Sequence, residues 1–256
     1  MHKVSRFNLI ICSLLAWLPM SAQIDIDPTD RNEQIQAMVE HELDSLFHYS
    51  SLAYLQPDAF RLTDNDILRF SKRYDIEPAA VMAVLDIEAG KFHQGFSEPR
   101  LPLINFDQKL FRQRLAKTGV NMSEIQKQYP ELFVAPAISK YGTQQRKEHA
   151  LLKQAREIND QLAVECTFWG MFQIGGFNWK KCGAPDVDIF VEEMSRSERD
   201  QLAMFGILLE KTGMLDSVRN KQWNRFARAY NGPSYKARGY DRRLASSYEK
   251  YKKTMQ

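Results

Sequence analysis

Glu88 is the residue of this sequence whose surroundings best suit proton-transfer chemistry. Residues 79–90 (AAVMAVLDIEAG) have the spacing of a helix, on which Val81, Val84 and Leu85 share one face with Glu88. A carboxyl group partly removed from water favours its neutral form, which raises its pKa and lets it donate a proton near neutral pH. The alternative is a carboxylate at the helix end that reaches water or pairs with an arginine.

A second segment, residues 168–179 (FWGMFQIGGFNW), combines aromatic residues and glycines with the amides of Gln173 and Asn178. This composition fits a surface on which sugar rings stack against aromatic faces while amide side chains meet hydroxyl or acetamido groups. It does not fit a phosphate-binding loop, because no Lys and Ser/Thr pair follows the glycines. The alternative is an aromatic core helix that ends at a glycine turn.

A third segment, residues 229–241 (AYNGPSYKARGYD), places Tyr230, Tyr235 and Tyr240 five residues apart around an Asn-Gly-Pro turn. Tyrosines in such a loop either offer exposed rings for stacking or hold the loop to the core by ring burial and hydroxyl hydrogen bonds. The pattern by itself leaves both interpretations open.

The composition excludes several classes of protein. With 256 residues, 44% hydrophobic and 11% aromatic, the chain is too apolar to be disordered, and three cysteines cannot form a disulfide framework. The net charge of +3 is modest, and the basic run at 236–243 is short and interrupted by Asp241. We therefore expect no nucleic-acid partner, and such a patch better suits an anionic polymer.

The first 22 residues have the order of parts of a signal peptide. Lys3 and Arg6 precede an apolar run over 7–18, and small residues follow, with cleavage expected after Ala22. The run is much shorter than the roughly 20 residues needed to span a bilayer, so no stable membrane anchor is expected. We expect an exported protein, periplasmic or secreted. Cys166 and Cys182 then remain, either as a disulfide or as two buried thiols.

Helical spacing dominates the rest of the chain. Residues 23–61 are expected to hold an amphipathic helix (30–50) and a linker, with the helix packed on the main domain or docking a partner. Residues 62–256 are expected to form one mostly α domain, with helix starts at Thr63 and Pro78. Further helices are predicted over 105–118, 146–172, 195–212 and 222–229. No apolar and polar alternation is sustained and no repeat period is visible, which supports the mostly α interpretation.

Taken together, the three segments resemble the N-acetylmuramidase domain of lysozyme-like, peptidoglycan-cleaving enzymes, as found in phage endolysins and secreted bacterial proteins. The resemblance covers about residues 62–250 and implies a lysozyme-like single domain. The matching stretches are LTDND (62–66), EPAAVMAVLDIE (77–88), GF (95–96), PLINFDQKLF (102–111), FWGMFQIGGFNW (168–179), residues 190–202, and WNRFARAYNGPSY with GYDRRLA (223–245).

The resemblance also implies roles for individual residues. It makes Glu88 the catalytic acid, and Asp107 is the best candidate for a second carboxylate. Asp107 stands where the family has Phe-Glu-x-His, here Phe-Asp-Gln-Lys. The side chains expected to contact the glycan, from the resemblance and from the aromatic and amide pattern, are Trp169, Gln173, Asn178, Tyr230, Asn231 and Tyr240.

The expected reaction is cleavage of the glycan bond after N-acetylmuramic acid. Hydrolysis would use a second carboxylate, roughly 6.5–9.5 Å from the acid for inversion or about 5–5.5 Å for retention. A lone acid could instead act as a lytic transglycosylase, and a non-catalytic wall-binding scaffold is the third alternative. No cofactor or metal is expected, since His41 and His48 are seven residues apart rather than the four of a zinc helix. Asp86 is expected to be solvated.

Overall fold

The computed structural model describes residues 60–90, 94–134 and 141–255. The chain divides into two units, and all of these residues belong to the second, Gln56–Gln256. The expected signal peptide and the expected helix over 30–50 lie outside the described residues. Within the described range, no helix is both long enough and apolar enough to cross a membrane.

The protein is mostly α-helical, as the sequence predicts. The α-helices are α3 (Asp64–Tyr74), α4 (Pro78–Glu88), α5 (Gln108–Ala116), α6 (Met122–Gln128), α7 (Tyr141–Ile158), α8 (Asp160–Glu165), α9 (Val187–Arg196), α10 (Glu198–Lys211), α11 (Leu215–Arg219), α12 (Trp223–Asn231) and α13 (Tyr240–Thr254). Shorter elements are the 3-10 helices η3 (Pro130–Phe133), η4 (Gly176–Asn178) and η5 (Pro233–Tyr235), and the strands β1 (Phe96–Glu98), β2 (Leu101–Pro102), β3 (Ile104–Phe106), β4 (Thr167–Trp169) and β5 (Ile174–Gly175).

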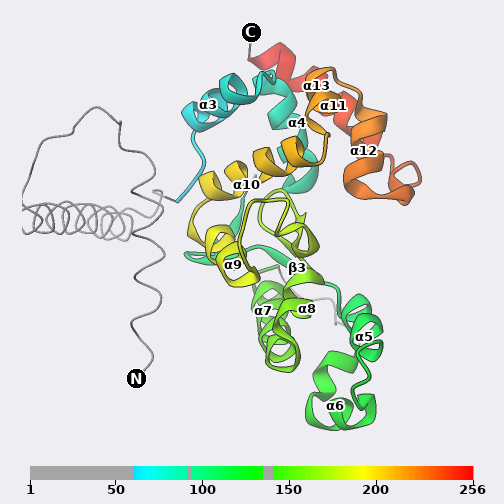
Figure 1. Ribbon diagram of the computed structural model, residues 1–256. Helices are drawn as coiled ribbons and strands as arrows, with labels where there is room; N and C mark the ends of the chain where they lie inside the picture. The colour runs from blue at the N-terminus through cyan, green and yellow to red at the C-terminus, as the bar shows by residue number, and fades with distance from the viewer. Residues whose placement is uncertain (1–59, 91–93, 135–140, 256) are drawn as a thin grey trace, which may run out of the picture. The chain divides into compact units, whose positions relative to one another are not determined.

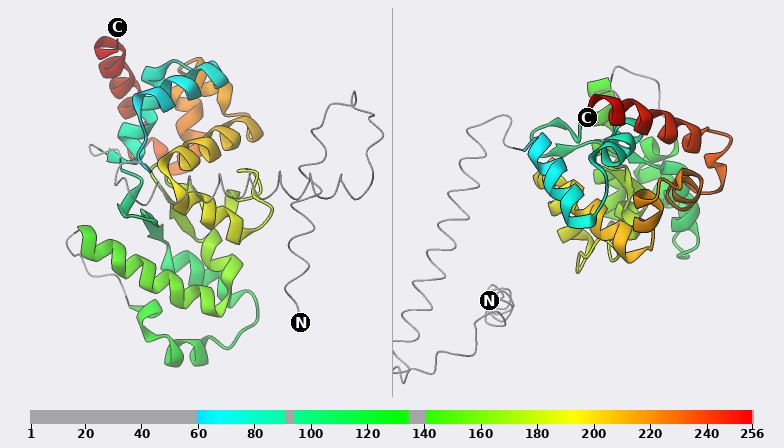
Figure 2. Two further views of the ribbon diagram at one scale, coloured as in Figure 1. Left: turned by 90° about the vertical axis from the view of Figure 1, so that its left-hand side faces the viewer. Right: turned by 90° about the horizontal axis from the view of Figure 1, so that it is seen from above.

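The helices gather in two groups with a small sheet between them. Figures 1 and 2 show α3, α4 and α10 to α13 together, and α5 to α8 together, with β3 between the groups in Figure 1. The sheet has the strand order β3-β4-β5, and both pairings are antiparallel. β1 and β2 form a separate antiparallel pair. α4 ends at Glu88 and packs along α13, beside which it lies in the right-hand view of Figure 2.

Two predicted helix starts are confirmed by their local geometry. Thr63 is the N-cap of α3, where its hydroxyl accepts from the main-chain N–H of Asp66 and the Asp66 carboxylate accepts from the main-chain N–H of Thr63. This reciprocal pair satisfies two amides that the first helical turn leaves without partners. Pro78 is the first residue of α4, where a missing N–H costs nothing.

The short strands were not foreseen from the sequence, and they change the bounds of two predicted helices. The predicted helix over 105–118 begins only at Gln108, and the one over 146–172 ends in α8, because residues 104–106 and 167–169 pair as β3 and β4. The predicted helix over 195–212 is interrupted at Ser197, whose extended backbone and hydroxyl cap α10. Strands of two or three residues are too short for an alternation to stand out from helical spacing.

The core surrounds the predicted apolar face of α4. Val81, Val84 and Leu85 are buried almost completely, which confirms that face. Aromatic rings fill the space between the elements, and Phe172 stacks on Phe205 with 4.3 Å between ring centroids. The helix is therefore fixed in position by packing along its whole length.

Polar contacts join the opposite side of α4 to α13. The Asp86 carboxylate accepts a hydrogen bond of 2.7 Å from the hydroxyl of Ser247, and Glu77 accepts one of 2.6 Å from the hydroxyl of Tyr248. Lys250 lies 3.8 Å from Asp86. The expectation that Asp86 is solvated was wrong, because residues of α13 cover its carboxylate. These residues lie far along the chain, so local spacing could not reveal them.

Candidate active site

Glu88 lies at the end of α4, where it is half-buried. Burial raises its pKa from the usual 4.5 to about 7, although the hydrogen bond from Asn231 and the positive charge of Arg243 both act to lower it. Gly90 then takes a φ of 65°, in the left-handed region, so the chain turns away directly after the acid. A glutamate with a pKa near 7 holds its proton in a large fraction of molecules at neutral pH and can donate it.

Asn231, the last residue of α12, holds the acid from the other side. Its Nδ2 donates a hydrogen bond of 2.9 Å to Oε1 of Glu88. Its Oδ1 is also buried and has no hydrogen-bond partner among the described residues. Gly232 follows with a φ of 74° and ends the helix at this point. The two helix ends thus meet at one carboxyl group.

Tyr230 anchors the same helix end to the turn between β4 and β5. Its hydroxyl donates a hydrogen bond of 2.6 Å to the carbonyl oxygen of Phe172, and burial raises its pKa well above the usual value. In the same turn Gln173 adopts a φ of 47° and donates from Nε2 to the carbonyl oxygen of Gly170 at 2.9 Å. The contacts bring Gln173, Tyr230, Asn231 and Glu88 into one neighbourhood.

Trp169 does not face the solvent, and the prediction that it contacts substrate was wrong. Its side chain is 1% exposed, and its indole Nε1 donates to the carbonyl oxygen of Val164. Its ring meets Phe190 edge to face. Trp169 therefore belongs to the core, because the pairing of β4 with β3 turns every second side chain inward.

Asn178 and Tyr240, two further predicted contacts, are half-buried and stay predictions. Asn178 ends η4, and its carbonyl oxygen accepts from the amide of Cys182. Tyr240 begins α13, and the guanidinium of Arg243 lies 5.4 Å from its ring centroid. The positive charge of Arg243 also acts to lower the pKa of Glu88.

The pattern missed Phe177, whose side chain is 53% exposed. Every other described phenylalanine is buried or half-buried. A pair of glycines directly before it was the signal that could have singled it out, because glycine allows a ring to lie against the backbone.

Asp107, the predicted second carboxylate, has a structural partner. It is the N-cap of α5, and its Oδ1 accepts from the main-chain N–H of Leu110 at 2.8 Å. α5 packs against α8, whereas the helix of Glu88 packs against α13. The pKa of Glu88 is changed by its burial, by the hydrogen bond from Asn231 and by the charge of Arg243, and Asp107 is not among these causes. The catalytic role of Asp107 stays a prediction.

The chain after Glu88 is fixed again at Gly95 by a buried acid. Glu198, which is 2% exposed, accepts hydrogen bonds from the main-chain N–H groups of Leu62 and Gly95 at 2.7 and 2.8 Å. The side chain of Gln201 leaves no room for a Cβ at Gly95. α10 thereby holds the strand that follows the acid.

Cys166 and Cys182 are both buried free thiols. Of the two alternatives for this pair, two buried thiols are therefore confirmed and a disulfide is not. Burial raises the pKa of Cys182 to about 12, and burial also raises that of Cys166 despite the nearby guanidinium of Arg114. Neither is a nucleophile at neutral pH. Among the described residues, no three His, Cys, Asp or Glu side chains lie together as metal ligands.

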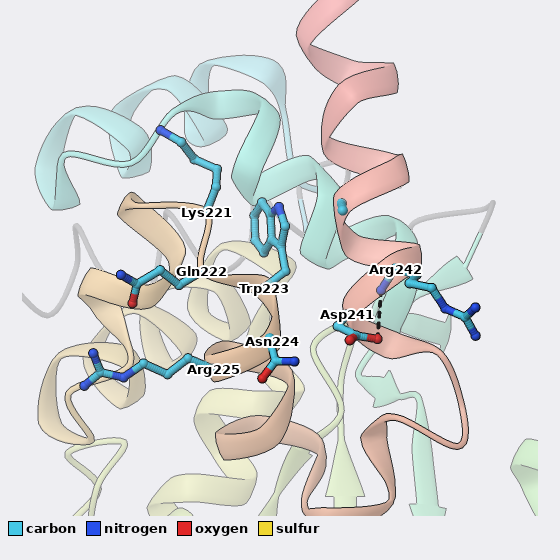
Figure 3. A pocket seen from close by; sticks show the side chains of 8 residues that line it. Lys221, Gln222, Trp223, Asn224, Arg225, Asp241 and Arg242 are labelled. Atoms are coloured by element: carbon cyan, nitrogen blue, oxygen red, sulfur yellow. Dashed lines mark hydrogen bonds between the residues drawn. The ribbon is translucent and has the colours of Figure 1, made fainter.

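Two surface pockets of about 510 and 500 Å³ lie elsewhere, and neither is lined by Glu88. Figure 3 shows the first, where Trp223, Asn224 and Asp241 line the hollow and the head group of Arg242 points outward. The second includes His149, whose ring bonds to the carbonyl oxygen of Pro102. The acid thus lies outside both pockets.

A mostly helical fold, with a half-buried glutamate at one helix end held by an asparagine from another, is that of a lysozyme-like enzyme. The sequence model of the N-acetylmuramidase family (Muramidase) matches residues 77–252. The chain belongs to this family and is a peptidoglycan hydrolase.

The structural comparison agrees with the family match. A crystal structure of the Burkholderia AP3 phage endolysin is similar, with 32% identity and a TM-score of 0.63 over 81% of this chain and 77% of that one. Comparison with curated proteins gives no match.

Proposed function

We propose that the protein cleaves the glycan strand of peptidoglycan at the bond after N-acetylmuramic acid, with Glu88 as the general acid. The observation that carries the proposal is the half-buried carboxyl group of Glu88, whose pKa of about 7 suits proton donation to a leaving oxygen. The hydrogen bond from Asn231 fixes one carboxyl oxygen and leaves the other for the substrate. Family membership supports the substrate class.

The surroundings of Glu88 disfavour a retaining pair of carboxylates. A nucleophile about 5–5.5 Å away would be negatively charged and would raise the pKa of the acid by repulsion. Among the described residues, the charge that acts on Glu88 is instead the positive one of Arg243. Two routes remain, and they differ in the nucleophile. Asp107 could activate a water at the longer inverting distance, or a hydroxyl of the substrate could attack as in a lytic transglycosylase.

The primary test is lysis of purified sacculi by matched variants. Glu88→Gln keeps the size of the side chain and an oxygen that can accept from Asn231, but it removes the transferable proton. We expect a loss of lysis of roughly 100-fold or more, as for other general acids. The control is Glu192→Gln, at an exposed position on α9, which should lyse like the wild type. Lysis by Glu88→Gln at the wild-type rate would overturn the assignment.

The released fragments decide between the two nucleophiles. Hydrolysis gives reducing ends, whereas internal attack gives anhydro ends that are lighter by one water, so mass spectrometry separates them. If Asp107 activates water, Asp107→Asn should abolish the formation of reducing ends. The other helix caps, such as Thr63 and Asp66 of α3, are unchanged in this variant. If anhydro ends predominate, Asp107→Asn should leave turnover intact. Binding of glycan without any product would instead support the scaffold.

The place of action follows from the substrate. Peptidoglycan lies outside the cytoplasmic membrane, so a protein that cleaves it acts there. The signal peptide expected over 1–22 supports an exported protein, periplasmic or secreted. A processed N-terminus at or near residue 23 in the mature protein would agree with this proposal.

A further inference from the structure

The three-stranded sheet has one face that is not part of the core. Asn105, Phe168 and Gly175 lie opposite one another across the three strands, so these three positions belong to the same face of the sheet. Their neighbours Ile104 and Trp169 are almost fully buried on the other side. Asn105 is exposed and Phe168 is half-buried. The row therefore forms the outer face of the sheet.

Phe177 completes this outer face by folding back onto Gly175. A Cβ at Gly175 would overlap the ring of Phe177. The ring therefore occupies the space that a side chain at position 175 would fill. The ring meets Phe168 edge to face, with 6.3 Å between centroids and an interplanar angle of 89°. A Cβ at Gly176 would overlap the carbonyl group of Val164. The backbone that carries Phe177 is thus pressed against α8.

An aromatic ring held in one place with half its surface in water is a feature that folding does not require. Burial of a phenylalanine stabilises a protein by roughly 1.5–3 kcal/mol, and this exposed ring forgoes much of that gain. Polar side chains adjoin the two rings, since Asn105 lies beside Phe168 and Asn178 follows Phe177. A fixed apolar face next to amide groups matches a pyranose ring, whose C–H face stacks while its hydroxyl and acetamido groups take hydrogen bonds.

The sheet is also linked to the acid through a short series of contacts. The strand pair β4-β5 carries Phe168 and leads to Phe177, and the turn between its strands holds Phe172, whose carbonyl oxygen accepts from Tyr230. The residue after Tyr230 is Asn231, which holds Glu88. One short run of contacts therefore links the sheet to the proton donor.

We propose that the exposed ring of Phe177, supported from the side by Phe168, forms a stacking platform for an N-acetylated sugar ring of the glycan strand, with Asn105 and Asn178 as its polar edge. The platform rests on the proposed function, because it serves the substrate that Glu88 would cleave. It assigns to the aromatic-rich segment a role that buried Trp169 cannot fill.

The test measures saccharide binding separately from cleavage. The probe is a tetrasaccharide of alternating N-acetylglucosamine and N-acetylmuramic acid, titrated calorimetrically into proteins that carry Glu88→Gln so that it is not consumed. Adding Phe177→Ala should weaken binding by about 10-fold, as expected for the loss of one stacking ring. Phe177→Tyr should restore it, because the ring returns. Leu68→Ala is the control, since Leu68 is equally exposed but lies on α3.

The outcomes separate a failure of the platform from a failure of the proposed function. In otherwise unchanged enzyme, Phe177→Ala should raise KM on soluble glycan with little change in kcat, and the melting temperature should stay within a few degrees. Tight binding by Phe177→Ala, or equal losses for Phe177→Tyr and Phe177→Ala, would overturn the platform and leave the role of Glu88 untouched. A wild-type protein that neither binds nor cleaves the saccharide would overturn the proposed function and the platform with it.

Discussion

The hydrogen bond from Asn231 to Glu88 allows the pKa of the acid to be shifted in a defined direction. This bond lowers the pKa, because it stabilises the ionised carboxylate. Asn231→Ala removes it. A hydrogen bond to a charged group contributes roughly 1.5–3 kcal/mol, and each pKa unit corresponds to about 1.4 kcal/mol. The pKa of Glu88 should therefore rise by roughly 1 to 2, from its value of about 7.

The assay is the pH dependence of kcat/KM on soluble glycan, which reports the ionisation of the free enzyme. The acid must hold its proton, so wild-type activity should fall as the pH rises through about 7. In Asn231→Ala the fall should come roughly 1 to 2 pH units later, whatever happens to the maximal rate. Using the position of the limb rather than its height separates an effect on the acid from any loss of substrate contact.

The matched control is Asn65→Ala, an equivalent truncation at an exposed position on α3. Its alkaline limb should coincide with that of the wild type. An alkaline limb of Asn231→Ala that stays in place, or moves to lower pH, would refute the reasoning that this bond tunes Glu88.

Two further predictions concern stability and the thiols. Because the pKa of Glu88 rises from 4.5 in the unfolded chain to about 7 on folding, the native state holds its proton more tightly, and stability falls as the pH rises between those values. Glu88→Gln avoids this loss, so it should be more stable than the wild type by up to about 3 kcal/mol above pH 7, with no difference below pH 4, as measured by urea unfolding. Cys166 and Cys182 should react with a thiol reagent only after unfolding and without prior reduction; a mass two hydrogens lower for the purified protein would contradict the free thiols.

Local spacing was sufficient to find the acid but not its surroundings. The apolar face of α4 is a property of a few successive turns, and it correctly predicted a Glu88 that is partly removed from water and has a raised pKa. Asn231 lies 143 residues away, so its contact with the acid depends on how α12 packs, and only the resemblance pointed to it. Trp169 was placed wrongly because a strand of three residues reverses alternate side chains without leaving a readable period.

The same distance along the chain bears on how the surroundings of Glu88 assemble. The partners of Asp86 on α13 lie about 160 residues after it, at Ser247 and Tyr251, so α4 gains these contacts only when the last helix has been made. Contacts of such long sequence separation form late, since the intervening chain must first be closed into a loop. A chain in which α13 has not yet packed therefore lacks these supports for α4, the helix that carries Glu88.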